Sequence, residues 1–386
     1  MGNREWGTES VIRWQSELPE HKDCRQHSPL PTPHSLKAAP GAVLVILLLL
    51  SCSRGVEAAP SQEVTAAHEA AAAQEALALN EAGASQEAAS PIAGPRYALI
   101  PSNARPGEPV TVACSGGGFS SAGEGVLWAA LLDSRGRRLS RAAFFSLSGQ
   151  EGEEELRAAV LAVPSTAAAG NAVIRIEAGG GTVRELPFII DSREFRSETV
   201  QLNQGNTDLR TVPDPKKTAE AEQLWAVLSK TGTEIYSGNT FAPPVASTRR
   251  TSFYGDRRIY QYANGESDTS IHAGIDYGVP TGTEVKACAA GKVVLARNRI
   301  VTGNTVILEH LPGLYSLYYH MDSINVSEGS VINAGSLLGF SGSTGLATGP
   351  HLHWEIRVSG ENTDPDAFLA HPILDKSDII NKLTSY

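Results

Sequence analysis

Cysteine is scarce in this chain of 386 residues. Only four are present, namely Cys24, Cys52, Cys114 and Cys288. No two of them are spaced as Cys-x-x-Cys, so a structural zinc site built from thiolates is not supported. Cys114 and Cys288 lie far apart in apolar, strand-like segments. We therefore expect two buried free thiols and no disulfide framework.

Positive charge is also in deficit. The chain carries 32 Lys and Arg against 42 Asp and Glu, for a formal net charge of −10. Proteins that bind nucleic acid present a basic surface to the phosphates, so nucleic acid is excluded as the expected partner. The net charge says little about a ligand that is recognised inside a cleft.

Long apolar runs are missing as well. The most apolar run, residues 42–50, is too short to span a bilayer and is typical of the apolar region of a secretory signal. Residues 1–35 before it are polar and interrupted by proline, and we predict no fold for them. Lys37 would serve as a sparse basic region if translation began at or near Leu36, and we hypothesise that start.

Residues 36–56 thus form the predicted signal segment, and Leu49-Leu50-Ser51-Cys52 within it resembles a lipobox. A lipidated Cys52 would anchor an exported protein to a membrane, facing the periplasm or cell envelope. Cleavage near residues 56–58 with soluble secretion, or an uncleaved anchor, are the alternatives. Residues 57–94 are rich in Ala and Glu and are predicted to be a helical or disordered N-terminal tether.

Residues 95–191 change to short alternating segments separated by turn residues. Strands are predicted over residues 109–114, 126–132, 139–147, 158–163, 172–178 and 183–190. Asp133-Ser134-Arg135-Gly136 predicts a hairpin turn. This spacing predicts an immunoglobulin-like β-sandwich. It holds no histidine that could combine with its carboxylates in a site, so a stabilising module without a ligand is favoured over a spacing or substrate-docking role.

Residues 192–244 are predicted to be a linker that contains one helix, over residues 217–230. Its apolar positions Ala221, Leu224, Trp225 and Leu228 recur at helical spacing and indicate packing. A second β domain is predicted over residues 245–372, followed by a C-terminal tail, 373–386. The chain as a whole is therefore expected to be mainly β.

Two stretches of the second β domain alternate strictly, namely residues 270–280 (SIHAGIDYGVP) and 349–358 (GPHLHWEIRV). Alternation predicts a strand, which places His272 and Asp276 on one face of the first and His351 and His353 on one face of the second. A helix over the first stretch is disfavoured by Gly274. Each motif alone is weak evidence for a metal site, because such spacings also occur by chance. If the two strands are neighbours, however, their imidazole and carboxylate groups converge in a combination that suits zinc.

Three motifs in sequence order, HAGID, YYHM and TGPHLHWE, resemble those of the lysostaphin-type (LytM-like) zinc endopeptidases of bacterial cell walls. The similarity extends from about residue 245 to 371. It implies an antiparallel β-sheet metallopeptidase domain that binds Zn²⁺ and cuts peptide cross-links of peptidoglycan. By motif position it implies His272, Asp276 and His353 as zinc ligands, with His351 and His320 as catalytic histidines.

Roles for the two catalytic histidines follow only by analogy. We assign His351 as the general base and His320 as its helper or as the stabiliser of the oxyanion. Glu355 is expected either to hydrogen-bond a ligand histidine or to face solvent. His310 is expected to be structural and His371 to lie at the surface.

Two neighbouring segments complete the expected site. Arg257 and Arg258 are interpreted as a plain surface pair in a loop at the border of the cleft. The glycine-rich residues 339–349 are expected to form a cleft wall. They are not a phosphate loop, because no Lys-Ser/Thr pair or helix follows them.

Two other function classes are open to this sequence. A non-catalytic wall-binding protein, or an activator of other wall hydrolases, would share the fold, but the complete set of motif residues speaks against it. GTEVKACAAGKVV and GSVINAGSLLG resemble biotinyl or lipoyl carrier domains. That interpretation needs a modifiable lysine at a hairpin tip, whereas Lys286 and Lys292 lie within strand-like runs. No oligomeric state is predicted.

Overall fold

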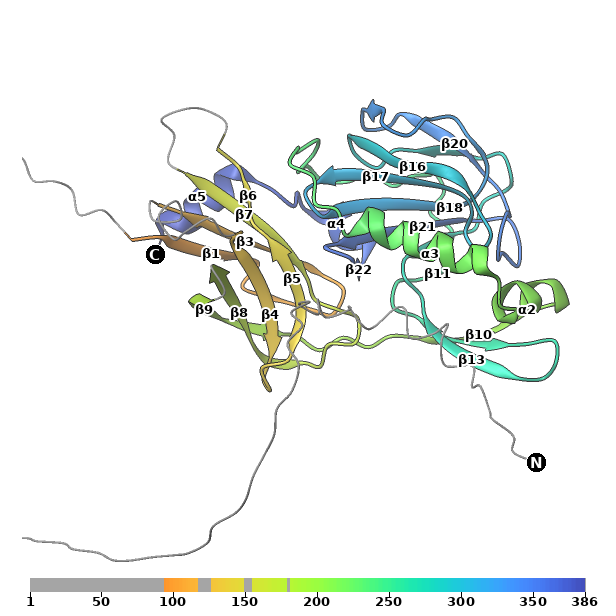
Figure 1. Cartoon of the computed structure of the whole chain (residues 1–386), viewed down its shortest axis with the longest axis horizontal. Coiled ribbons are helices and arrows are strands. Elements are labelled where there is room, and N and C mark those ends of the chain that lie inside the picture. The colour runs from red at the N-terminus through yellow and green to blue at the C-terminus, as the bar shows by residue number, and fades with distance from the viewer. Residues whose placement is uncertain (1–93, 117–125, 149–154, 179–180, 386) are drawn as a thin grey trace, which may run out of the picture. The chain divides into compact units, whose positions relative to one another are not determined.

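A computed structural model describes residues 94–116, 126–148, 155–178 and 181–385 (Figure 1). The predicted extension, signal segment, lipidated Cys52 and tether, all within residues 1–94, lie outside the described residues except for Gly94. No helix within the described ranges has both the length and the apolar character needed to cross a bilayer.

The first half of the described chain consists of two β-sheets that share one apolar core. One sheet has the order β1 (Arg96–Ile100), β3 (Pro109–Ser115), β7 (Leu156–Ala162), β6 (Phe145–Ser146). The other has the order β2 (Asn103–Ala104), β9 (Gly181–Ile190), β8 (Gly170–Ala178), β4 (Trp128–Asp133), β5 (Arg138–Ala143). Val112 and Leu161 of the first sheet pack with Leu131 and Ile174 of the second, all fully buried.

All the strands predicted in this half are present, with one difference. The segment predicted as a single strand over 139–147 is divided into β5 and β6, which belong to different sheets. The predicted hairpin connects β4 and β5. The Asp133 carboxylate accepts hydrogen bonds from the backbone N–H groups of Arg135 and Arg137, both at 2.9 Å, and Gly136 has a φ of +74° that favours glycine.

The connecting segment contains more structure than the sequence predicts. The predicted helix is present as α3 (Pro215–Leu228), which begins after Asp214, whose carboxylate caps Lys216 N at 2.7 Å. Strand β10 (Ser197–Gln201) and helix α2 (Gln204–Thr211) were not predicted. β10 pairs in parallel with β12 (Arg257–Gln261), which also pairs with β13 (Ser267–Ile271).

The second half is built on one large, mainly antiparallel sheet (Figure 1). Its main path is β11 (Arg250–Ser252), β14 (Ile275–Tyr277), β21 (Leu352–Val358), β18 (Leu314–Ile324), β17 (Gly303–Leu311), β16 (Gly291–Arg299), β19 (Val331–Ile332). Strands β15 (Glu284–Lys286), β20 (Leu337–Ser341) and β22 (Glu361–Thr363) join at its margins. The chain is therefore mainly β, as predicted.

The core of this sheet continues into the first half of the chain. Trp354, Tyr318 and Leu308 are fully buried in a cluster that also contains Val160 and Ala162 of β7. Cys288 belongs to the same cluster and Cys114 to the core of the first half, and both are buried free thiols, as expected.

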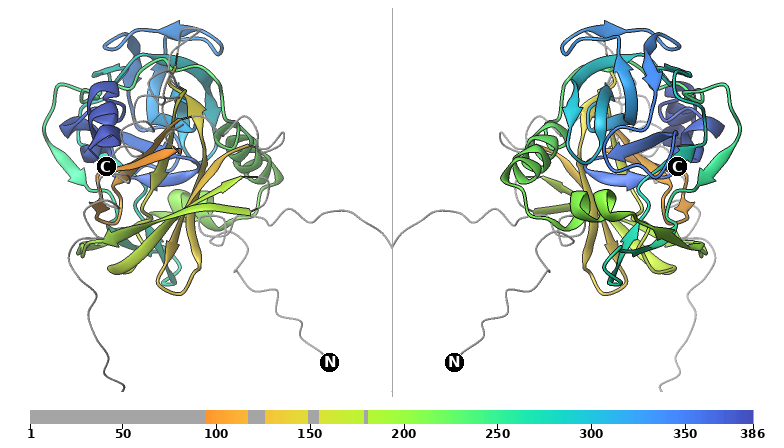
Figure 2. Two further views of the ribbon diagram at one scale, coloured as in Figure 1. Left: turned by 90° about the vertical axis from the view of Figure 1, so that its left-hand side faces the viewer. Right: turned by 90° about the vertical axis from the view of Figure 1, so that its right-hand side faces the viewer.

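Two short helices follow the large sheet. α4 (Pro365–Ala370) buries Phe368 in the core. α5 (Lys376–Thr384) lies against the first sheet of the chain, as Figures 1 and 2 show, and buries Ile379 and Leu383 beside Ala98 and Ala113. The predicted tail thus contains a helix that packs on β1 and β3.

Candidate metal centre

Two neighbouring strands position the candidate site. β14 and β21 pair antiparallel, and the register sets Asp276 directly opposite His353. The two motifs therefore lie side by side, which is the arrangement the predicted site requires.

The single strand predicted over residues 270–280 is wrong. The chain leaves β13 after Ile271 and re-enters the sheet at Ile275. Gly274 lies within this break, and its backbone passes so close to β21 that a Cβ would lie 2.2 Å from the carbonyl oxygen of Trp354. His272 consequently stands in the connection, with its N–H donating to Asp256 O at 2.9 Å.

Three side-chain atoms converge on one point. His272 Nε2 lies 3.0 Å from His353 Nδ1 and 3.2 Å from Asp276 Oδ1, and the last two atoms are 2.8 Å apart. All three residues are buried rather than on an open strand face. Among the residues that the structure describes, these three make the one group of His, Cys, Asp or Glu side chains that meets in this way.

This trio fits a zinc ion. His272 Nδ1 donates to Phe253 O at 2.8 Å, which leaves the lone pair of Nε2 directed at the other two ligand atoms. Two imidazoles and one carboxylate are the donor set of many catalytic zinc sites, with bond lengths of about 2.0–2.2 Å. A cation at those distances fits a triangle with sides near 3 Å.

The charges of the trio favour a cation. Burial raises the pKa of Asp276, but the two adjacent histidines outweigh it and hold that pKa well below its usual value. Burial lowers the pKa of His353, yet hydrogen bonds to Asp276 and Glu355 raise it to about 9. Without a metal, the His353 ring therefore tends to hold an extra proton beside Asp276. A metal ion that binds there would displace that proton.

Glu355 supports the trio from behind. It is buried on β21, and its Oε2 lies 3.5 Å from His353 Nε2, on the side of the ring opposite the ligand atom. Asn362 Nδ2 donates to Glu355 Oε1 at 2.8 Å, and Arg357 pairs with the same oxygen. Of the two expectations for Glu355, contact with a ligand histidine agrees with the structure.

The expectation for Arg257 and Arg258 as a surface pair is wrong. Both lie on strand β12, where alternation directs them to opposite faces. Arg257 donates to Ser165 O at 2.8 Å. Arg258 instead reaches the site, where its Nη2 lies 2.6 Å from Asp276 Oδ2. Strand periodicity would have separated the two side chains, had this segment been recognised as a strand.

The two further histidines face the trio from adjoining segments. The rings of His320 and His351 are 4.7 Å apart, and His351 Nε2 lies 3.9 Å from Asp276 Oδ1. His351 Nδ1 donates to Gly349 O at 2.8 Å, and His320 Nδ1 donates to Thr344 O at 2.7 Å. In its neutral form each ring therefore carries its proton on Nδ1 and leaves the lone pair of Nε2 free.

His320 stands at an irregular point of β18. The strand pairs with β21 as far as Tyr319 and with β20 from Met321 onward, and His320 between them has a φ of +60°. Burial, together with His351 and His353, lowers the pKa of His320 to about 3. Its imidazole is thus neutral at pH 7.

A cavity of about 440 Å³ opens onto these residues. One wall carries Glu198, Val200 and Leu202, from β10 and the residue after it, none of which the sequence analysis identified. Leu346 and Gly349 also line the cavity, so the glycine-rich segment does form a cleft wall, as expected.

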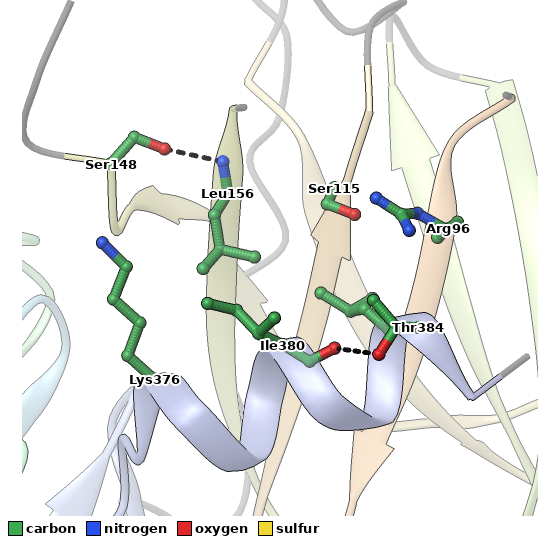
Figure 3. A pocket seen from close by; sticks show the side chains of 8 residues that line it. Arg96, Ser115, Ser148, Leu156, Lys376, Ile380 and Thr384 are labelled. Atoms are coloured by element: carbon green, nitrogen blue, oxygen red, sulfur yellow. Dashed lines mark hydrogen bonds between the residues drawn. The ribbon is translucent and has the colours of Figure 1, made fainter. Parts of the chain in front are cut away.

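A second cavity, of about 340 Å³, lies between α5 and the first sheet (Figure 3). Its described lining includes Arg96, Ser115, Leu156 and Lys376 but no imidazole, thiol or carboxylate, so it offers no set of metal ligands.

The other two histidines in the part of the chain that the structure describes behave as expected. His310 is fully buried and bonds to Ala290 O and Ser316 Oγ at 2.8 and 2.7 Å, which is a structural role. His371 follows α4 and is exposed.

Comparison with known proteins gives the following matches. Residues 270–365 match the model of Peptidase family M23. DD-carboxypeptidase/endopeptidase Mpg of Neisseria meningitidis serogroup B is 42% identical over 95 residues, which are 25% of this chain and 22% of Mpg. Peptidoglycan DD-endopeptidase ShyA of Vibrio cholerae is 30% identical over 176 residues, 45% of this chain and 40% of ShyA. The chain thus spans less than half the length of these relatives.

Solved structures similar to this chain include a putative peptidase M23 from Pseudomonas aeruginosa. It is 24% identical to this chain, with a TM-score of 0.46, and the match covers 69% of this chain and 94% of that one. The catalytic domain of lysostaphin from Staphylococcus simulans has 30% identity and a TM-score of 0.25, over 38% of this chain and 96% of that domain.

Proposed function

We propose that this chain, whose residues 270–365 belong to peptidase family M23, is a zinc metalloendopeptidase that hydrolyses peptide cross-links of peptidoglycan. The observation that carries the proposal is the buried triangle of His272 Nε2, Asp276 Oδ1 and His353 Nδ1 at the base of an open cavity. A structural metal site would be closed on all sides, whereas a catalytic one keeps a side accessible.

His272, Asp276 and His353 would hold the metal. When bound, Zn²⁺ supplies Lewis acidity toward a scissile carbonyl and an acidified water molecule. The two imidazoles bind as neutral ligands, so one positive charge remains on the site after Asp276 has neutralised the other. Glu355 keeps the ring of His353 in its orientation by contact with Nε2.

His351 is the proposed general base. With its Nδ1 proton held by Gly349 O, its Nε2 accepts a proton from the attacking water and can return it to the leaving amine. His320 is proposed as its helper, because its neutral ring uses its one N–H on Thr344 O and leaves Nε2 as an acceptor, with no N–H for an oxyanion. That arrangement favours the helper role over stabilisation of the oxyanion.

The proposed substrate is a DD-type peptide cross-link. Two relatives carry the words DD-carboxypeptidase/endopeptidase and DD-endopeptidase in their names. Peptidoglycan lies in the cell envelope, so export of this chain, with a lipidated Cys52 as its anchor, is part of the proposal. Secretion as a soluble protein is the alternative.

The first half is proposed to be an immunoglobulin-like module that stabilises the peptidase sheet. Support comes from the shared core at Val160 and Ala162, and from Thr111, whose hydroxyl donates to Ile373 O at 2.9 Å. Tyr254 Oη donates to Asn362 O at 2.9 Å and packs closely on Gly107 of the first half.

Digestion of purified sacculi tests the enzymatic proposal. The zinc-loaded protein should release muropeptides whose masses correspond to cleaved cross-links, while a chelator or His353→Ala should abolish release. His371→Ala, at an exposed position outside the site, serves as the matched control. Wild-type protein that binds sacculi and holds zinc but releases nothing would contradict the proposal and support a non-catalytic wall-binding role.

A further inference from the structure

A chain of ion pairs leads from Asp276 to a strand outside the family match. Asp276 directs Oδ1 at the two histidines, and its other oxygen, Oδ2, lies 2.6 Å from Arg258 Nη2. Arg258 Nε in turn lies 2.5 Å from Glu198 Oε1. Glu198 belongs to β10, in the segment that connects the two halves, whereas the match to family M23 begins at residue 270.

Both contacts are shielded from water. The side chains of Asp276 and Arg258 are 9% and 15% exposed, and that of Glu198 is 28% exposed. Arg258 cannot lose its proton, and its planar guanidinium offers donors in fixed directions. One cation between two carboxylates therefore fixes the orientation of both.

Glu198 also connects β11, the strand paired with β14 at Asp276, to β12 of the neighbouring three-stranded sheet. Its Oε1 accepts from Ser252 Oγ at 2.7 Å, and Ser252 on β11 is paired directly with Asp276 on β14. Arg258 stands on β12, which pairs with β10 in register from Glu198 to Arg258. The Glu198 carboxylate thus links β11 and β12 beside Asp276, the metal ligand on β14.

We propose that Arg258 and Glu198 are positioning residues for the metal ligand Asp276. Arg258 engages Oδ2, so that Oδ1 alone is presented to the cation, and Glu198 holds Arg258 in that position. The inference rests on the proposed function, because it takes Asp276 as a ligand. It adds that part of the metal site comes from β10, upstream of the family segment.

The consequence is a loss of metal affinity when the chain of ion pairs is broken. Without Arg258, Asp276 is free to rotate or to bind through both oxygens. Partners behind a ligand typically contribute about 10–100-fold to metal affinity. Arg258→Gln is expected to lose about that factor, and Glu198→Gln about tenfold, because it acts one step further away.

The test is zinc affinity of the full chain, measured by competition with a chromogenic chelator, so that no activity is needed. Glu266→Gln removes an exposed carboxylate in the turn between β12 and β13, and Thr199→Ala alters the exposed face of β10. Both controls should stay within about twofold of wild type. Arg258→Lys keeps the positive charge but loses the planar guanidinium with its fixed donors. Its zinc affinity should therefore lie between those of wild type and Arg258→Gln.

A double variant separates positioning from a general loss of structure. Since Glu198 acts through Arg258, Glu198→Gln should have no further effect on zinc affinity in an Arg258→Gln background. The absorption bands of the cobalt-substituted protein should change with Arg258→Gln, because they report how the carboxylate coordinates.

Three results would overturn the inference. The first is unchanged zinc affinity in both single variants while circular dichroism and the urea midpoint show them folded. The second is an additive loss in the double variant. In both cases the zinc-peptidase proposal survives. The third is failure of the wild-type chain to bind one equivalent of zinc, which would overturn that proposal as well.

Discussion

At the scale of single residues, the site separates groups that hold a metal from groups that handle protons. His353 reaches the trio through Nδ1, while His351, two positions earlier, has its Nδ1 occupied by Gly349 O and offers only Nε2. The same residue type thus serves two purposes because different backbone and side-chain partners fix the ring orientation.

This difference makes the two histidines distinguishable by experiment. His353→Ala should reduce bound zinc to a small fraction of one equivalent, whereas His351→Ala should keep close to one. Both should lower the rate of cross-link cleavage, His351→Ala by about 10²–10⁴-fold as for loss of a general base. Elemental analysis alongside the hydrolysis rate checks this. Loss of zinc from His351→Ala would contradict the assignment.

His310 provides a prediction about pH and stability. Burial lowers its pKa in the folded protein to about 4, against an ordinary value of 6.5, while the bond to Ala290 O opposes the shift. Below pH 6.5 the unfolded chain binds a proton at His310 that the folded chain does not bind. This group should therefore lower the free energy of unfolding by about 3 kcal/mol as the pH falls from 6.5 to 4.

Urea denaturation at several pH values measures this contribution. His310→Gln should be less stable at pH 7.5 but should lose less stability than wild type as the pH is lowered to 4. His371→Gln, at an exposed position, should follow the wild-type slope. Equal slopes for His310→Gln and wild type would show that His310 is not the titrating group.

At the scale of elements, alternation was a good guide to which segments are strands. The strands that carry Asp276 and His353 were predicted from it, and the antiparallel pairing of β14 with β21 makes them neighbours. Alternation failed where tertiary contacts dominate. The break before β14 coincides with the close approach of Gly274 to Trp354, and no local pattern encodes that contact.

The Arg258 contacts were missed for a similar reason. Glu198, Arg258 and Asp276 come from three different strands. β10 pairs with β12 in parallel, and parallel strands are not joined by a hairpin turn that the sequence could reveal. Three of the five residues of β10 are exposed and polar, so its sequence resembles a linker. The ligands could be predicted from motifs, but the groups that orient them could not.

Gly274 tests the importance of the close approach between β14 and β21. A Cβ at this position would lie 2.2 Å from Trp354 O, so Gly274→Ala must move backbone that aligns Asp276 with His353. We expect a loss of about 2–4 kcal/mol in the free energy of unfolding, at or above the usual cost of overpacking, and weaker zinc binding. Gly349→Ala is the matched control, since nothing lies within 4 Å of its Cβ position. Equal stability of the two variants would contradict this account.

At the scale of the whole molecule, the two halves share core and polar contacts. Val160 and Ala162 of the first half are buried among side chains of the large sheet. Arg193, in the connecting segment, donates to Pro106 O at 2.9 Å on one side and lies 2.5 Å from Asp364 Oδ2 on the other. We therefore expect the described residues between 94 and 385 to unfold cooperatively as one unit.

Arg193 gives the sharpest test of that coupling. Asp364 has a side chain only 10% exposed, and burial raises its pKa even with Arg193 beside it. Arg193→Ala would leave this carboxylate without its cation, so we expect a loss of about 2–4 kcal/mol. Hydrogen exchange followed by mass spectrometry should show faster exchange in both β3 and β17, because the two halves open together. Arg175→Ala is the control, since Arg175 forms an exposed ion pair with Glu185 that contributes less than about 1 kcal/mol. Faster exchange in one half alone would show that the halves unfold independently and that the first half does not stabilise the peptidase sheet.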